Sequence, residues 1–180
     1  MIPFDFDGPI CEVFAGLPAA SVARRLERRL GERVESDDPL QILRESVRFG
    51  PEVVQAVEYD LVVAELEAID SAVATPGGLE SMAAGLAAGK VVGVLSNNSP
   101  QPIVEFLKAA GLLSGVQPIV GRAYANPSLM KPHPYPLQQA LLTAQLKPAE
   151  VVFIGDSMAD IEVALTGRVK SVAPAGEQAG

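Results

Sequence analysis

The stretch Ile-Pro-Phe-Asp-Phe-Asp-Gly, residues 2–8, runs a short apolar segment directly into two aspartates. Two later stretches have the same form, because residues 91–97 (VVGVLSN) and 151–156 (VVFIGD) also pass from apolar into polar side chains. Continuous apolar runs bounded by helical patterns are typical of strands that are buried on both faces, as in a parallel sheet. Parallel sheets place their ligands at the carboxyl ends of the strands. The three stretches therefore predict a functional edge where these polar residues meet.

From residue 75 onwards, helical and strand patterns alternate regularly. After the break at residues 75–78, helices are expected at 79–88, 101–110, 134–146 and 160–165, and strands at 91–95, 117–120, 151–156 and 169–173. Parallel strands joined by helices make right-handed crossovers. We therefore predict an α/β fold whose parallel sheet is flanked by helices.

Residues 13–74 interrupt this alternation with a pattern that is helical throughout. Helices are expected at 21–34, 39–49 and 51–72. In the third of these, Glu58, Glu65 and Asp70 are expected on the outer face. The sequence thus predicts a core of residues 1–12 and 75–180, with a small all-α module of residues 13–74 inserted after the first strand.

The chain has 180 residues, of which 48% are apolar and 20% charged. This length and composition predict one globular unit. The formal net charge of −8 argues against a protein that binds nucleic acid through a basic face. No stretch approaches the ~20 apolar residues that cross a bilayer, and no basic segment followed by an apolar run indicates a secretory signal. The single cysteine, Cys11, fits a reducing compartment. These features predict a cytoplasmic protein without nucleic-acid or membrane partners, and no pattern indicates its oligomeric state.

A group of polar residues gathers at the predicted edge of the sheet. Its members are Asp5, Asp7, Ser96, Asn97, Lys131, Asp156 and Asp160. Converging carboxylates repel one another, by ~4 kcal/mol for a pair ~4 Å apart at an effective dielectric constant of ~20. A divalent cation removes this repulsion, and Mg²⁺ commonly binds carboxylates, water and a substrate phosphate oxygen together. The edge is therefore a candidate Mg²⁺ site that accepts an anionic phosphate in acidic surroundings.

Four ordered segments at this edge resemble the motifs of the haloacid dehalogenase superfamily of hydrolases. They are Phe4–Gly8, Leu95–Asn97, Lys131-Pro132 and Gly155–Asp160. The resemblance covers nearly the whole chain, and residues 13–74 fall where that superfamily carries a helical cap of the first-position (C1) type. It implies a Rossmann-like core under this cap, and a phosphatase branch similar to phosphoglycolate phosphatases and β-phosphoglucomutases.

The resemblance also implies a role for each residue of the edge. Asp5 is expected to be the nucleophile that forms an aspartyl-phosphate, and Asp7 the general acid and base. Ser96 and the backbone amide of Asn97 are expected to hold the phosphoryl oxygens, while Lys131 neutralises charge between Asp5 and the phosphate. The implied Mg²⁺ ligands are Asp5, Asp7 through its backbone carbonyl, Asp156 and Asp160.

The second aspartate separates the branches of this superfamily. Members that cleave carbon–halogen bonds lack an acid there, because they need neither a leaving-group proton nor a metal. Asp7 therefore favours a Mg²⁺-dependent phosphatase that acts on a small phosphorylated metabolite. Two alternatives stay open: a sugar phosphomutase, which returns the phosphoryl group to its substrate, and a non-catalytic binding or regulatory module that retains the fold. Pro9, where the family usually has Thr or Val, supports the second alternative.

Overall fold

The computed structural model describes residues 1–173, so residues 174–180 of the predicted core lie outside the described part. Its centre is a five-stranded sheet in the order β5-β4-β1-β6-β7, and every neighbouring pair of strands is parallel. The strands are β1 (Ile2–Phe4), β4 (Val92–Leu95), β5 (Val116–Val120), β6 (Val152–Ile154) and β7 (Lys170–Val172). The sheet confirms the predicted α/β class and places β1 in the middle.

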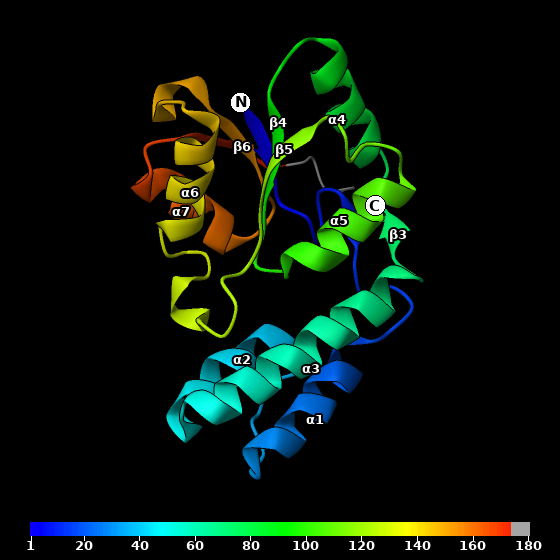
Figure 1. Ribbon diagram of the computed structural model, residues 1–180, viewed down its shortest axis with the longest axis vertical. Helices are drawn as coiled ribbons and strands as arrows, with labels where there is room; N and C mark the ends of the chain where they lie inside the picture. The colour runs from blue at the N-terminus through cyan, green and yellow to red at the C-terminus, as the bar shows by residue number, and fades with distance from the viewer. Residues whose placement is uncertain (174–180) are drawn as a thin grey trace, which may run out of the picture.

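Two pairs of helices cover the two faces of the sheet (Figure 1). They are α4 (Gly78–Ala87) and α5 (Pro100–Ala109) on one face, and α6 (Tyr135–Ala144) and α7 (Met158–Thr166) on the other. Short 3-10 helices, η2 (Pro127–Leu129) and η3 (Pro148–Glu150), precede α6 and β6. Among the described residues, no helix combines the length and the apolar character that a membrane crossing requires.

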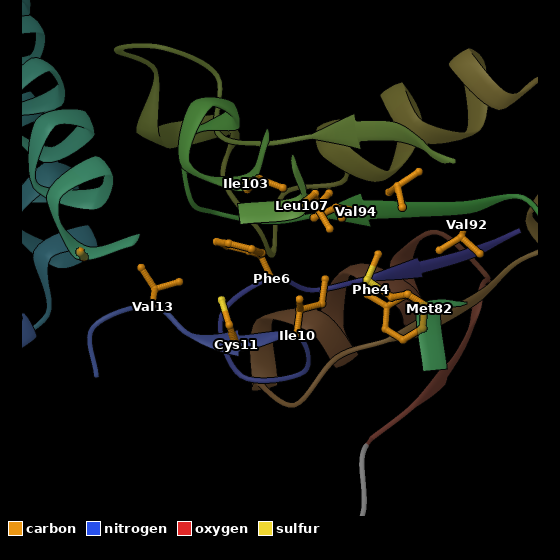
Figure 2. Packing of buried hydrophobic residues seen from close by; sticks show 12 residues of the cluster. Phe4, Phe6, Ile10, Cys11, Val13, Met82, Val92, Val94, Ile103 and Leu107 are labelled. Atoms are coloured by element: carbon orange, nitrogen blue, oxygen red, sulfur yellow. The ribbon is translucent and has the colours of Figure 1, made fainter. Parts of the chain in front are cut away.

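Apolar side chains of β1 and of the loop that follows it fill the face of the sheet under α4 and α5. Phe4 is 3% exposed, and Phe6 and Ile10 are fully buried. Figure 2 shows them gathered with Met82 of α4 and Leu107 of α5. Full burial of an aromatic or aliphatic side chain contributes about 1.5–3 kcal/mol. Because Phe4 and Phe6 flank Asp5, this packing also fixes the backbone of the predicted nucleophile.

The first strand ends earlier than the predicted apolar stretch of residues 2–6. The amide of Asp5 still donates a hydrogen bond to the carbonyl of Ile154 (2.8 Å), but the carbonyl of Phe6 then accepts from the amides of Ile10 and Cys11. These bonds close a turn in place of a strand ladder. Asp5 and Asp7 thus lie beyond the strand, where strand alternation no longer sets the direction of their side chains.

A second group of helices lies below the sheet in Figure 1. It contains α1 (Ala19–Leu30), α2 (Pro39–Ser46), the 3-10 helix η1 (Val47–Phe49) and α3 (Pro51–Ile69). Val22, Leu26 and Leu30 face inward from α1 and pack with α2 and α3 in a hydrophobic cluster separate from that of the sheet. These helices match the expected all-α insertion, and its limits at residues 13 and 74 stay a prediction.

The expectation that residues 13–74 are helical throughout is wrong at the end of this segment. Val73–Ala74 form a short strand, β3, which pairs antiparallel with β2 (Cys11–Glu12). The amide of Thr75 extends the pairing by donating to the carbonyl of Ile10 (3.0 Å). The chain therefore leaves the core and returns to it through two adjacent strands.

The expectation that Glu58 and Glu65 lie on the outer face of α3 is also wrong, because both side chains are buried. They face Arg122, in the loop after β5, which is only 3% exposed. The guanidinium lies 2.8 Å from Glu58 and 2.9 Å from Glu65. A buried cation thus compensates acids whose helical spacing is that of a solvated face. Asp70, in contrast, is exposed as expected.

Candidate active site

Asp5 follows β1 directly, and only 8% of it is exposed. Its Oδ1 accepts a hydrogen bond from the amide of Phe6 (2.7 Å) and lies 2.8 Å from Nζ of Lys131. Burial raises the pKa of Asp5 to about 6; the charge of Lys131 opposes this rise, and the charge of Asp160 adds to it. The charge of Lys131 alone therefore does not offset the cost of burying the ionised Asp5 carboxylate.

Among the described residues, Lys131 supplies the only ammonium group that contacts the carboxylates of Asp5 and Asp160. It is 2% exposed, and its Nζ donates to Oδ1 of Asp160 (2.6 Å) and to the carbonyl of Leu95 (3.1 Å), besides its contact with Asp5. The ammonium also lies 5.6 Å from the centre of the Phe153 ring. One buried cation is thus shared between two carboxylates.

Asp156 and Asp160 follow β6 at the same edge. Asp160 is 1% exposed, and its Oδ2 accepts hydrogen bonds from the amide (3.0 Å) and the hydroxyl (2.7 Å) of Ser157, the N-cap of α7. Burial alone would raise the pKa of Asp160, but the charge of Lys131 and these hydrogen bonds outweigh it and lower the pKa. Asp156 is exposed, and desolvation raises its pKa.

Carboxylate oxygens of Asp5, Asp156 and Asp160 lie within 4.8 Å of one another. Two glycines make this approach possible: an added Cβ at Gly8 would overlap the Asp156 carboxylate, and one at Gly155 would lie 2.6 Å from Cγ of Asp160. Hard oxygen donors are the ligands that Mg²⁺ prefers. The donor set therefore fits a divalent cation, which Asp5 and Asp156 face most openly because both oxygens of Asp160 already accept hydrogen bonds.

Ser96 and Asn97 follow β4 at this edge. Oγ of Ser96 donates to Oδ1 of Asn98 (3.1 Å) and accepts from the Asn98 amide (3.2 Å). The Asn97 side chain accepts from the amide of Lys131 (2.8 Å) and donates to its carbonyl (3.2 Å). It thus braces the lysine loop against β4, while the backbone amide of Asn97 is the group that the sequence predicts for phosphate.

Asp7 is exposed, and its carboxylate is not among the three that meet within the described residues. Oδ1 accepts a hydrogen bond from the amide of Val13 (2.9 Å). Desolvation raises the pKa of Asp7 against the opposing effect of this hydrogen bond. A raised carboxyl pKa suits a group that gives and takes a proton near neutral pH.

A cavity of about 270 Å³ opens beside Asp7, between the sheet and the helical group. Its apolar lining consists of Phe14, Ala19, Pro39, Leu40 and Leu61. Its polar lining consists of Asp7, Asp37, Asp38, Glu65 and Asn98. No lysine or arginine of residues 1–173 lines it, so the wall of this cavity is apolar and acidic.

Pro9 leaves the loop after the two aspartates intact. The hydrogen bonds of this turn come from the amides of Gly8, Ile10 and Cys11. None of them needs an N–H group at residue 9, so the missing donor of proline costs nothing here.

Residues 2–166 match the family model of haloacid dehalogenase-like hydrolases. The chain belongs to this family. A search of curated proteins found no match. The sequence-based resemblance is confirmed, and the chain is an enzyme of the hydrolase type.

Solved structures share the fold of this hydrolase. A predicted phosphatase from Clostridium acetobutylicum is 17% identical with a TM-score of 0.75, and the match covers 96% of this chain and 82% of that one. A protein assigned as a phosphoglycolate phosphatase from Lactobacillus plantarum is 18% identical with a TM-score of 0.72, over 96% and 84% of the two chains. A variant of CbbY from Rhodobacter sphaeroides, in complex with xylulose-1,5-bisphosphate, is 16% identical with a TM-score of 0.75, over 97% and 85%.

Sequence reasoning missed several residues of the hydrolase that lie next to this edge. Asn98 and Ser99 continue the polar run after β4, and that continuation is a signal that could have found them. Arg122 donates to the carbonyl of Asn97 (2.7 Å), and Arg44 of α2 donates to the carbonyl of Lys131 (3.3 Å). No local pattern marks these two arginines, because their partners lie far away in the sequence.

Proposed function

We propose that this hydrolase is a Mg²⁺-dependent phosphatase that removes the phosphoryl group from a small metabolite through an aspartyl-phosphate on Asp5. The observation that carries the proposal is the position of Asp5. Its buried carboxylate lies 2.8 Å from the Lys131 ammonium and within 4.8 Å of carboxylate oxygens of Asp156 and Asp160. A nucleophile, a cation and a metal-binding donor set are thereby in reach of one phosphoryl group.

In the proposed metal site, Asp5 and Asp156 would hold Mg²⁺ directly, the carbonyl of Asp7 would be a further ligand, and Asp160 would orient the site. The ion would supply positive charge that neutralises the phosphoryl oxygens. Asp160 is suited to an orienting role because Lys131 and Ser157 already bind its two oxygens. The raised pKa values of Asp5 and Asp156 support the need for added positive charge.

The chain itself supplies the covalent chemistry of the proposed reaction. A carboxylate oxygen of Asp5 attacks phosphorus, the ester P–O bond breaks, and the leaving oxygen takes a proton from Asp7. In the second step Asp7 takes a proton from water, whose oxygen attacks the same phosphorus and releases Asp5. Ser96, the amide of Asn97 and Lys131 hold the phosphoryl oxygens in both steps.

The cavity beside Asp7 supports a leaving group of restricted size and charge. Its volume of about 270 Å³ suits a small organic group. Because its polar wall is acidic, the cavity disfavours a second phosphate or a carboxylate and favours hydroxyl or amino groups. We therefore propose a neutral or cationic leaving group, which differs from the xylulose-1,5-bisphosphate bound by the CbbY variant.

The experiment that tests the proposal is a panel of phosphate esters with Mg²⁺, using Asp5→Asn as the control variant. We expect phosphate release by the wild type and a loss of about 10⁴-fold or more in the variant, since the nucleophile is removed. Turnover that survives in Asp5→Asn would refute the role of Asp5. An isomeric phosphate in place of free phosphate would identify a phosphomutase, and no turnover despite Mg²⁺ binding would identify a non-catalytic module.

A further inference from the structure

We propose that Glu65, acting with Arg122, is a positioning residue for the phosphate-binding loop, Ser96–Ser99. The inference rests on the proposed function, because it takes Ser96 and Asn97 as the groups that hold the phosphoryl oxygens. Glu65 belongs to α3 of the helical group, whereas the loop belongs to the core. A residue of the helical group therefore holds the loop that is proposed to bind phosphate.

Arg122 joins α3 to the core. Its Nε donates to both carboxylate oxygens of Glu58 (2.9 and 3.1 Å), and its Nη1 and Nη2 donate to Glu65 (2.9 and 3.2 Å). The side chains of all three residues are at most 1% exposed. A guanidinium fork held on two sides in this way has a fixed orientation.

The same arginine fixes two carbonyl groups of the loop. Its Nη1 donates to the carbonyl of Asn97 (2.7 Å), and its backbone amide donates to the carbonyl of Asn98 (2.8 Å). In a trans peptide the N–H and C=O bonds point in opposite directions. The amide of Asn98 therefore points away from Arg122, and there it donates to Oγ of Ser96 (3.2 Å).

Glu65 completes a continuous chain of hydrogen bonds to Ser96. It accepts from the amide (3.1 Å) and hydroxyl (2.6 Å) of Ser99 and from Nδ2 of Asn98 (3.3 Å). Oδ1 of the same Asn98 accepts from Oγ of Ser96 (3.1 Å). Through Asn98, Glu65 thus holds the side chain of Ser96 in position. When phosphate binds, the single hydroxyl proton of Ser96 turns from Oδ1 of Asn98 to a phosphoryl oxygen, while Oγ still accepts from the Asn98 amide.

Glu58 provides a matched comparison for Glu65. Both residues lie on α3, both are buried, and both pair with the Arg122 guanidinium. Within residues 1–173, Glu65 also bonds to the loop and Glu58 does not. Because Glu65 also lines the cavity beside Asp7, the deciding measurement is the affinity for inorganic phosphate, which carries no leaving group. A purely structural role predicts equal effects of the two substitutions, whereas a positioning role predicts a larger loss of phosphate affinity in Glu65→Gln.

The experiment compares wild type, Glu58→Gln and Glu65→Gln by urea unfolding, by kcat and KM for para-nitrophenyl phosphate, and by binding of inorganic phosphate with Mg²⁺. We expect similar losses of stability in the two variants. We expect kcat and phosphate affinity to fall roughly tenfold to a hundredfold in Glu65→Gln, and by no more than about twofold in Glu58→Gln. Equal losses in the two variants would overturn the proposal.

Ser99→Ala keeps the proposal falsifiable if Glu65→Gln does not fold. It removes the hydrogen bond from the Ser99 hydroxyl to Glu65 and leaves the Arg122 ion pairs in place. We expect it to reproduce the loss of phosphate affinity, by roughly threefold to tenfold, and an unchanged affinity would overturn the proposal. Failure of the proposed function is a different result, because the wild type itself would then neither release nor bind phosphate.

Discussion

Lys131 is the residue on which the electrostatics of the active site depend. Its ammonium lies 2.8 Å from Asp5 and 2.6 Å from Asp160, and it is 2% exposed. Because Asn97 holds the backbone of this residue, the cation is fixed from two directions. The lysine therefore stabilises the folded site and is in place before any substrate arrives.

Removing this cation by Lys131→Met is expected to lower the free energy of unfolding by about 3–5 kcal/mol at pH 7.5, because two buried carboxylates lose their partner. The loss should be smaller at pH 5, where protonation can remove the uncompensated charge. Urea unfolding at the two pH values measures the difference. Lys108→Met is the matched control: Lys108 is exposed and pairs weakly with Glu105 (3.5 Å), so we expect a change within about 0.5 kcal/mol. Equal losses at both pH values would contradict the charge argument.

The raised pKa of Asp5 predicts how Mg²⁺ and pH act together on stability. The folded protein binds this proton more tightly than the unfolded chain, since the pKa is about 6 against 3.8. Without metal, the contribution of Asp5 to the free energy of unfolding should thus fall by about 3 kcal/mol as the pH rises from about 4 through 6, while the lowered pKa of Asp160 acts in the opposite direction below pH 4. Mg²⁺ binds the ionised form, so it should raise the melting temperature more at pH 7.5 than at pH 5. Thermal unfolding with and without MgCl₂ tests this, and a pH-independent Mg²⁺ effect, or one retained in Asp5→Asn, would contradict it.

Sequence reasoning identified the residues that follow apolar runs, and it failed for residues whose partners are distant. Asp5 and Asp156 are marked by the strands before them, so their approach could be predicted. Glu58 and Glu65 recur at a helical spacing that is the same for a solvated face and for a buried ion pair. Only Arg122, more than fifty residues later in the chain, distinguishes the two, and nothing near Arg122 marks it as buried.

At the scale of elements, the loop after β1 packs closely against the loop after β6, and Gly8 makes this contact possible. This residue has a φ of +102°, and a Cβ there would overlap the Asp156 carboxylate. The backbone of one segment of the proposed metal site thus approaches the side chain of another more closely than any residue but glycine allows. The exact placement of Asp156 depends on this contact.

Gly8→Ala is accordingly expected to displace Asp156 and to weaken Mg²⁺ binding by roughly tenfold or more. Isothermal titration of the apoprotein with MgCl₂ measures the affinity. Gly50→Ala is the control for backbone strain, because Gly50 has a similar φ of +96° but open space around its Cβ position. The control should lose stability and keep its Mg²⁺ affinity. An equal loss of affinity in both variants would show that strain, and not the overlap with Asp156, is responsible.

The longer elements could be predicted from their patterns, and the shortest could not. The spacing of Val22, Leu26 and Leu30 predicts α1 because those side chains face one hydrophobic cluster. The ribbon of β2 and β3 has two residues in each strand, which is too short for any periodicity to appear. Its pairing depends on where α3 ends, and therefore on tertiary packing.

At the scale of the molecule, the helical group contacts the core in two different ways. The part of α3 from Glu58 onward is held by the buried pairs of Arg122, whereas the lysine loop contacts the helical group through the hydrogen bond from Arg44 of α2 to the carbonyl of Lys131 (3.3 Å) and through Met130, which packs in the hydrophobic cluster of these helices. Buried charge-assisted pairs with several hydrogen bonds open rarely, whereas a contact made by one long hydrogen bond and one apolar side chain opens more readily.

We therefore expect the helices of this group to respond unequally to a ligand. In hydrogen–deuterium exchange, inorganic phosphate with Mg²⁺ should slow exchange in α1 and α2, while residues 58–69 of α3 stay as protected as the sheet in both states. Asp5→Asn with Mg²⁺ omitted serves as the unliganded reference. A uniform change over α1, α2 and α3 would contradict the expectation and would indicate that the whole group moves as one body.

The fold class and the family were predictable at this scale because the four motif segments occur in order along almost the whole chain. The charge of −8 leaves room for the proposed phosphate site, because Lys131 and the carboxylates act locally. The predicted cytoplasmic location rests on one cysteine and stays a prediction. The contact between α3 and the core could not be predicted from the sequence, because it depends on ion pairs that form only in the folded state.

The central place of β1 has a consequence for the order of events in folding. Its partners are Val92–Val94 and Ile154, so the strand that precedes Asp5 cannot pair until residues far along the chain are present. The contacts among α1, α2 and α3 are local by comparison, and local contacts form first. During synthesis the helical group can thus fold before β1 has any partner, and the edge that carries Asp5, Lys131 and Asp156 is complete only after β6 has paired with β1.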